Sequence, residues 1–413
     1  MKIVGLITEY NPFHNGHLYH IKEAKKMTGA DYVIVVMSGN FVQRGAPALI
    51  DKYNRTEMAL ACGADIVLEL PVSFSTASAE LFALGAVSLL DKLGIVDYLC
   101  FGSECGNTTL LENAASILLK EPKEYKEVLN HLLKKGNTFP AARMEALKAI
   151  SPLIGDSLLS FPNNILGIEY LKALLRLNSP IKPVTITRLT AEYSSLDLTP
   201  CTEKTISSAT AIRKALFHEK SLTNFENHVP RSVYKLMQEN YQKTFPICDG
   251  DFSLLLNYKL MQETKATLTK YSDITPDLAN RIHDTNTQGL NFKELAGKIK
   301  TRQWTLTRIN RVLIHLLLNL YSDNFNEYKE SGYAQYARLL GFKKTSSHLI
   351  REILKNENIP VITKMADAKE QLSSIGLTML KEDIFAAHLY NQVAYNKYGT
   401  VLKDEYTRGV IIF

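Results

Sequence analysis

Two histidines flank a glycine in the most distinctive short segment of the chain, His14-Asn15-Gly16-His17. Imidazoles can donate hydrogen bonds to phosphate oxygens as negative charge builds up during a displacement at phosphorus, without a covalent step. Gly16 lets a ligand approach the backbone closely, because it carries no side chain. We therefore predict that His14 and His17 are catalytic. The alternatives are helix capping, core packing and metal ligation; two histidines are too few for a metal site, so no metal ligands are predicted.

The pattern around this segment places it at a turn from a strand to a helix. The apolar run over residues 2–7 is typical of a buried strand, and residues 17–27 are amphipathic with helical periodicity. The N-terminus of a helix offers unpaired backbone N–H groups and a partial positive charge, and both favour phosphate. The sequence thus predicts a phosphate-binding turn.

The first half of the chain continues to alternate apolar runs with helical stretches, which is typical of a parallel sheet covered by helices on both faces. Ligands bind outside the carboxyl ends of the strands in such sheets, so the residues after each strand are candidates for the site. Further strands are predicted over residues 32–37, 65–69, 96–101 and 184–188, and a helix over 77–93.

The second half has mainly helical periodicity, and few of its segments are plausible strands. We therefore predict an α/β domain over residues 1–216 and a mostly helical domain over residues 217–413. The clearest helical segments of the second half are residues 252–261, 306–320, 334–340 and 347–354.

The composition is that of a folded protein, because 46% of the 413 residues are hydrophobic and 22% are charged. The apolar runs are far shorter than the roughly 20 residues that a membrane-spanning helix needs, so no membrane association is predicted. The five cysteines are an odd number without a Cys-x-x-Cys pair, which favours a reducing compartment. We expect a cytoplasmic protein.

The excess of positive over negative charge lies in the second half of the chain. Residues 1–200 carry 19 basic and 20 acidic side chains, whereas residues 201–413 carry 29 and 22. A basic band over residues 293–311 includes Trp304, and a second basic group begins at Arg338. Basic side chains can neutralise RNA phosphates, and an aromatic ring can stack on an unpaired base. The alternatives are a solvated basic face and a tryptophan in the core. The predicted tRNA-binding residues are Lys298, Lys300, Arg302, Arg308, Arg311, Lys343 and Lys344.

Five sequence strings together point to a known family. The string ITEYNPFHNGHLYH at residues 7–20 resembles the first motif of the nucleotidyltransferase superfamily, which shares the His-x-Gly-His turn with class I aminoacyl-tRNA synthetases. The whole chain is similar to bacterial tRNA(Met) cytidine acetate ligases. The supporting strings are SGNFVQRG at 38–45, FGSE at 101–104, FPNNILGIEY at 161–170 and ISSATAIR at 206–213.

The resemblance implies a fold and a set of ATP contacts. The implied fold is a Rossmann-like nucleotidyltransferase domain with a parallel sheet, followed by the mostly α-helical domain. Ser207, Ser208 and Arg213 would hold the triphosphate, although two serines before a helix are also an ordinary cap. The other implied ATP-binding residues are Ile7, Thr8, Glu9, Tyr10, Asn11, Pro12, Phe13, His14, Asn15, Gly16, His17, Leu18, Tyr19, His20, Gly102, Asn163 and Arg188.

The resemblance also implies a reaction. Acetate would attack ATP in the presence of Mg²⁺ to give acetyl-adenylate, and the acetyl group would pass to N4 of the wobble cytidine of elongator tRNA(Met) with release of AMP. Two other functions stay open on the residues alone. One is a nucleotidyltransferase that adenylates a small metabolite in cofactor synthesis; the other is a non-catalytic RNA-binding protein that retains a nucleotide site.

Overall fold

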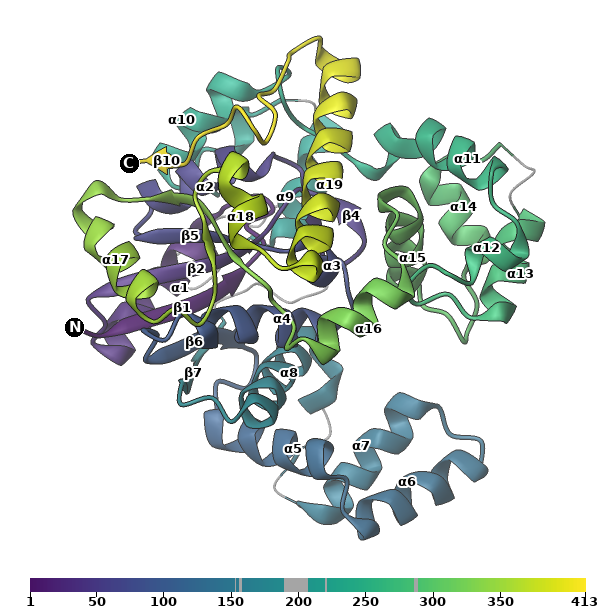
Figure 1. Cartoon of the computed structure of the whole chain (residues 1–413). Helices are drawn as coiled ribbons and strands as arrows, with labels where there is room; N and C mark the ends of the chain where they lie inside the picture. Colours follow the sequence, from purple (N-terminus) through teal and green to yellow (C-terminus); the bar gives the residue numbers. More distant parts are fainter. Residues whose placement is uncertain (153, 156–157, 189–206, 220, 286–288) are drawn as a thin grey trace.

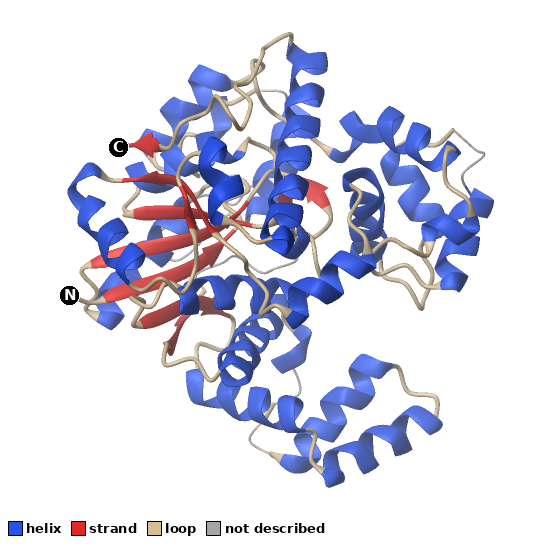
Figure 2. Ribbon diagram, in the orientation of Figure 1, coloured by secondary structure: helices blue, strands red, loops and turns tan. Residues whose placement is uncertain are grey.

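A mixed β-sheet positions the other elements of the molecule (Figure 2). The structure is a computed structural model of the whole chain, and it describes residues 1–152, 154–155, 158–188, 207–219, 221–285 and 289–413. Within these residues the strand order is β10-β8-β5-β2-β1-β6-β7, with β9 beside β8. The strands are β1 (Ile3–Thr8), β2 (Tyr32–Ser38), β5 (Ile66–Leu70), β6 (Tyr98–Ser103), β7 (Lys182–Thr187), β8 (Ala337–Phe342), β9 (Val361–Ile362) and β10 (Ile411–Ile412).

The strands β5, β2, β1, β6 and β7 are parallel, as predicted for the first half. Both faces of the sheet are buried, which explains the near-continuous apolar runs. Ile3 and Ile7 pack in one apolar cluster with helices α4 and α8, while Val4 and Leu6 face the opposite cluster with α1 and α2. The helices that cover the sheet are α1 (Asn15–Thr28), α2 (Lys52–Ala61), α3 (Val72–Ser75), α4 (Ala79–Lys92), α8 (Pro162–Leu177), α9 (Ala209–Glu219) and α10 (Arg231–Asn240).

Two groups of helices extend from this core (Figure 1). A hairpin of α6 and α7 projects beyond α5, and a lobe built from α11 to α15 has an apolar cluster of its own. The long helix α19 lies beside α15, α16 and α3 and so joins the lobe to the sheet. These helices are α5 (Thr108–Lys120), α6 (Lys123–Lys134), α7 (Phe139–Ile150), α11 (Ser253–Met261), α12 (Lys265–Leu268), α13 (Pro276–Thr285), α14 (Phe292–Ile299), α15 (Leu306–Leu318), α16 (Ser322–Glu330), α17 (Ser347–Lys355), α18 (Ala368–Gln371) and α19 (Ser374–Tyr398).

The prediction of a helix over residues 334–340 is wrong. Strand β8 occupies residues 337–342 and pairs antiparallel with β5, and β9 and β10 pair with β8. A short apolar run that is buried on both faces has no periodicity that separates a strand from a helix. The sheet therefore takes strands from both sides of residue 216, and the division into two domains at that residue stays a prediction.

None of the helices in the described part of the chain combines the length and the apolar character that crossing a membrane requires. Cys62 and Cys100 are buried and Cys105 and Cys248 are partly buried, and all four are free thiols. Cys201 lies outside the described residues.

A buried ionic cluster connects the C-terminal segment to the sheet. Lys52 on α2 lies 2.8 Å from Glu69 on β5 and 2.9 Å from Glu405, and Arg338 on β8 pairs with the same two carboxylates. Arg338 is only 3% exposed, so the sequence-based view that it belongs to a basic surface group is wrong. Burial raises the pKa of Glu405, but the charges of Lys52 and Arg338 outweigh this effect and lower it to about 2.

We expect the substitution Glu405→Gln to destabilise the protein strongly. It leaves two buried cations facing one carboxylate, and breaking a buried ion pair typically reduces the free energy of unfolding by ~3–5 kcal/mol. Urea denaturation followed by circular dichroism measures this loss. The same substitution at the exposed Glu226 is the control, expected to change stability by less than ~0.5 kcal/mol. An equal effect at both positions would contradict the role given to the cluster.

Candidate active site

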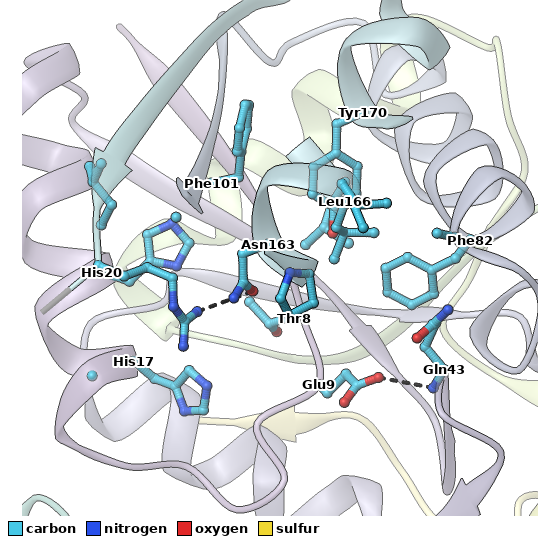
Figure 3. A pocket seen from close by; sticks show the side chains of 18 of the residues that line it. Thr8, Glu9, His17, His20, Gln43, Phe82, Phe101, Asn163, Leu166 and Tyr170 are labelled. Atoms are coloured by element: carbon cyan, nitrogen blue, oxygen red, sulfur yellow. Dashed lines mark hydrogen bonds between the residues drawn. The ribbon is translucent and has the colours of Figure 1, made fainter. Parts of the chain in front are cut away.

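A cavity of about 580 Å³ lies at the carboxyl ends of the parallel strands (Figure 3). Strand β2 pairs with one edge of β1, and β6 pairs with its other edge. The strand order therefore reverses between β1 and β6. This is where open α/β sheets bind nucleotides. Of the predicted ATP-binding residues, those that line the cavity are Ile7, Thr8, Glu9, His14, Gly16, His17, Tyr19, His20, Gly102, Asn163 and Arg188.

The two motif histidines cap helix α1 and are fixed by its backbone. His14 is the N-cap, and its Nδ1 accepts the backbone N–H of Gly16 at 3.0 Å. The Nδ1 of His17 accepts the backbone N–H of His14 at 3.2 Å. Because an amide can only donate, both Nδ1 atoms must be unprotonated, and each neutral ring carries its proton on Nε2. The sequence analysis treated capping and catalysis as alternatives, but the two are compatible. Each ring uses Nδ1 for the cap and keeps its Nε2–H group as a hydrogen-bond donor.

The backbone amides at the start of α1 are already used within the protein. The N–H of Asn15 donates to the carbonyl of His228 at 3.1 Å, and the N–H of Gly16 is held by His14. The N–H of His17 donates to the carbonyl of His14 at 2.9 Å. The expectation that these amides are unpaired is therefore wrong, and their contact with phosphate stays a prediction. The Nε2–H groups of the two imidazoles are further donors that could meet a phosphate at this turn.

Burial and neighbouring cations keep the histidines neutral. The rings of His14 and His17 are stacked, with 3.8 Å between their centroids. Desolvation, reinforced by the charges of Arg188 and Arg213, lowers the pKa of His14 to about 3. Desolvation and the neighbouring His14 hold the pKa of His17 well below 6.5, and burial lowers that of His20 to about 4. The Nε2 of His20 is enclosed without a hydrogen-bond partner among the described residues. These groups would meet phosphate as neutral donors.

A chain of polar contacts holds Arg188 against the cavity. Its Nη1 donates to Oδ1 of Asn163 at 3.3 Å, and Nδ2 of Asn163 donates to Glu104 at 2.5 Å. Glu104 therefore fixes which way the amide of Asn163 points. A Cβ on Gly102 would lie 3.2 Å from Cγ of Arg188, so glycine allows the arginine to cross β6 at close range.

The other predicted ATP-binding residues do not line the cavity. Tyr10 and Phe13 are buried in the apolar cluster beneath α1, and Ser208 accepts the N–H of Ala211 as an ordinary cap of α9. Arg213 donates to the carbonyl of Asn11 at 2.6 Å, so it acts on the site through its charge and by holding the turn. ATP contact stays a prediction for all of the residues, both those that line the cavity and those that do not. The residues away from the cavity are Tyr10, Asn11, Pro12, Phe13, Asn15, Leu18, Ser207, Ser208 and Arg213. Ile206 lies outside the described residues.

Sequence reasoning missed most of the apolar wall of the cavity. Phe82 comes from α4 and Tyr170 from α8, and Thr307 reaches the cavity from the helical lobe. Three of the quoted strings contain some of the missed residues: those at residues 38–45, 101–104 and 161–170. Their positions after a strand or at the start of a helix could have pointed to the cavity. The lining residues that were not predicted are Gln43, Arg44, Ala79, Phe82, Phe101, Pro162, Ile165, Leu166, Tyr170, Ile186 and Thr307.

The structure separates the predicted tRNA-binding residues into three groups. Lys298, Lys300 and Arg302 are exposed on the lobe, near the end of α14. Arg308 and Arg311 pair with Asp273 at 2.9 Å and 3.5 Å. Trp304 is 7% exposed in the core of the lobe, which is the ordinary alternative to stacking on RNA.

The third group lies at the opposite edge of the sheet. The backbone N–H of Lys343 donates to the carbonyl of Asp65, which precedes β5, and Lys344 follows it. The amino ends of the parallel strands lie here, whereas the cavity lies at their carboxyl ends. Lys343 and Lys344 are therefore not beside the cavity. Contact of these two lysines with tRNA stays a prediction.

The pH dependence of stability should reveal the buried ring of His14. Below its unfolded pKa of 6.5 the unfolded chain binds a proton that the folded protein does not bind until pH about 3, so stability falls as the pH falls. The slope is ~1.4 kcal/mol per pH unit for one group. We expect His14→Asn to lower the slope of the wild-type curve by this amount between those limits, as measured by urea unfolding of both proteins; His17 and His20 keep slopes of their own. His131→Asn, at an exposed histidine, is the control. Parallel curves for wild type and His14→Asn would contradict the low pKa.

Comparison with known proteins agrees with this geometry. The model of the family described as HIGH Nucleotidyl Transferase matches residues 1–405. A tRNA(Met) cytidine acetate ligase of Acetivibrio thermocellus is 40% identical over 419 residues, which cover all of both chains. One of a Thermoanaerobacter species is 43% identical over 392 residues, covering 94% of this chain and 95% of that protein.

Solved structures show the same fold. The crystal structure of Thermotoga maritima TmcAL in its apo form I superimposes with a TM-score of 0.92 at 31% identity, covering all of both chains. The form II structure of the same protein, bound with alpha-thio ATP, has a TM-score of 0.90 and covers 99% of that chain. The resemblance drawn from the sequence motifs is confirmed. The chain belongs to the HIGH nucleotidyltransferases and, among them, to the tRNA(Met) cytidine acetate ligase family of enzymes.

Proposed function

We propose that this protein activates acetate with ATP and transfers the acetyl group to N4 of the wobble cytidine of elongator tRNA(Met), in the cytoplasm. The single observation that carries the proposal is the pair of neutral, stacked imidazoles beside a cavity at the strand-order reversal. The names of the relatives supply the substrates, and one structural relative is bound with alpha-thio ATP.

In the first step an acetate oxygen attacks the α-phosphorus of ATP. The bond from that phosphorus to the bridging oxygen breaks, pyrophosphate leaves with the electron pair, and acetyl-adenylate forms. The Nε2–H groups of His14 and His17 donate to the oxygens on which charge accumulates. Their depressed pKa values mean that they do so as neutral donors, and Arg188 supplies a full positive charge at the same wall.

Mg²⁺ fits this site as a companion of the nucleotide. Glu9 is the one acidic side chain among the described residues that line the cavity. Mg²⁺ commonly binds through one or two carboxylates together with substrate phosphates and water. When bound, the ion would neutralise charge on the triphosphate.

The lobe offers a route for RNA to the cavity. Lys298, Lys300 and Arg302 are exposed just before α15, and Thr307 near the start of α15 lines the cavity. We propose that these cations bind the phosphates of the tRNA while its anticodon reaches the cavity.

The function is tested by incubating the protein with ATP, Mg²⁺ and labelled acetate, with and without tRNA. We expect acetate-dependent exchange of pyrophosphate into ATP without tRNA, and label in tRNA(Met) when it is present. Adenylation of a metabolite without labelled RNA would indicate a metabolite nucleotidyltransferase. RNA binding without exchange or label would indicate a non-catalytic protein.

Two substitutions at His14 separate capping from catalysis. Asn can place its side-chain oxygen where Nδ1 accepts the N–H of Gly16, but it has no group at the position of Nε2. We expect His14→Asn to reduce pyrophosphate exchange at least 100-fold and to keep the helix cap. His14→Ala should lose exchange equally and also ~1 kcal/mol of stability. Exchange that survives in His14→Asn would leave the ring with a capping role alone.

The exposed cations of the lobe should control affinity for tRNA. We expect the triple substitution of Lys298, Lys300 and Arg302 by Gln to weaken tRNA binding by at least tenfold and to flatten its dependence on salt concentration. Filter binding at several salt concentrations measures both effects. Lys343→Gln together with Lys344→Gln, at the opposite edge of the sheet, serves as the comparison. A larger effect at that edge would place the tRNA there.

A further inference from the structure

The cavity has two sides that differ in chemistry. Figure 3 shows His17 and His20 on one side and Glu9, Gln43 and Phe82 on the other, with Asn163 between them. The first side lies over the start of α1 and the ends of β6 and β7, at the reversal of strand order between β1 and β6. The second lies over the loop after β2 and the start of α4, beyond the reversal. Since nucleotides bind at the reversal, the second side is free to take another substrate.

The second side combines apolar walls with one carboxylate. Phe82 and Tyr170 are buried aromatic residues that line it, and Leu166 adds an aliphatic surface. Oε1 of Glu9 accepts the backbone N–H of Gln43 at 2.9 Å, which fixes the carboxylate at the cavity wall. Glu9 and Tyr170 line the same cavity. Such a site suits a flat ring with an amine on its edge.

Arg55 forms hydrogen bonds with the backbone of the loops that form this side. This fully buried guanidinium donates to the carbonyls of Glu9 at 2.6 Å, Ser38 at 2.9 Å and Ile50 at 2.8 Å, and also to that of Gly39. It thereby ties the loop after β1 to the loop after β2. The turn after Gln43 is fixed in addition by Gly45, which has a φ of +71° and where a Cβ would lie 2.2 Å from the backbone nitrogen of Arg311 on α15. The subsite is therefore built before any substrate arrives.

We propose that this second side binds the acceptor cytosine, with its ring against Phe82 and Tyr170 and its exocyclic amine at Glu9. The inference rests on the proposed function and specifies where the second substrate lies. A carboxylate accepts a hydrogen bond from N4 of cytosine, whereas a uracil would present a carbonyl oxygen and be repelled. Thr307 brings the cavity next to the lobe, on which the exposed cations lie.

The position of Glu9 also gives it a part in the transfer step. The nitrogen lone pair of N4 attacks the acyl carbon of acetyl-adenylate, and the bond from that carbon to the phosphate oxygen breaks. AMP leaves with the electron pair, and the amine loses a proton to the carboxylate of Glu9. Acetate, ATP and cytidine thus yield acetylcytidine, AMP, pyrophosphate and one proton.

The test compares two reactions in the same variants of the full-length protein. Acetate-dependent pyrophosphate exchange reports the nucleotide side, and acetylation of tRNA reports both sides. We expect Phe82→Leu to lower acetylation about tenfold relative to exchange. Glu9→Gln should lower acetylation of tRNA at least 100-fold; its effect on exchange is read separately, because Glu9 would also hold Mg²⁺ in the first step. Asn163→Ala is the matched control on the nucleotide side and should lower both reactions in parallel. Thermal unfolding of each variant checks that it is folded.

Two results would overturn the subsite. If Phe82→Leu raises the KM for ATP in the exchange reaction as much as it lowers acetylation, the adenine occupies the second side. If Glu9→Gln acetylates a tRNA with cytidine as fast as the wild type does, the carboxylate does not contact N4. Absence of exchange and labelling in the wild-type protein would instead refute the proposed function itself, so the two failures are distinguishable.

Discussion

The site depends on one constraint: the hydrogen bonds that backbone amides donate to Nδ1 of His14 and His17. An imidazole has two nitrogens, and a committed Nδ1 leaves Nε2–H as its only donor. The same bonds hold the rings 3.8 Å apart, a spacing at which two charged imidazoles would repel each other. Burial and two nearby arginines add to this preference for the neutral form. Helix geometry thus sets the protonation state of the two imidazoles.

The sheet explains why such a turn is held so rigidly. Strand β1 lies in the middle of it, between β2 and β6, and its residues are buried on both faces. The turn that follows β1 is therefore anchored by a fully buried strand. The C-terminal segment strengthens the far side through Glu405, which bridges α2 and β8 beside Glu69. Because each of these ions is buried, the cluster is stable only when all of its members are present.

The sequence allowed the positions near strand ends to be predicted, because their signal is local. The strand β1, the turn with its two histidines, Gly102 and Arg188 all lie next to apolar runs whose type could be recognised. Phe82 and Thr307 could not be found in this way, since they are ordinary residues of helices that reach the cavity only through tertiary packing. Strand β8 was mistaken for a helix because burial on both faces removes periodicity. Arg338 looked like a surface charge because its partner Glu405 lies 67 residues away.

The two sides of the cavity differ in chemistry, and this difference bears on how an acetyl-adenylate would be protected from water. An acyl-adenylate is destroyed by water, so an intermediate that had to leave the site would lose much of its acetyl group. With the imidazoles on one side and an apolar wall on the other, the proposed subsites would hold the acyl carbon at the boundary between them. An acceptor base seated against Phe82 and Tyr170 would both present its amine and displace water from that boundary. Binding the RNA and protecting the intermediate would then be the same event, which explains why a lobe with exposed cations adjoins the cavity.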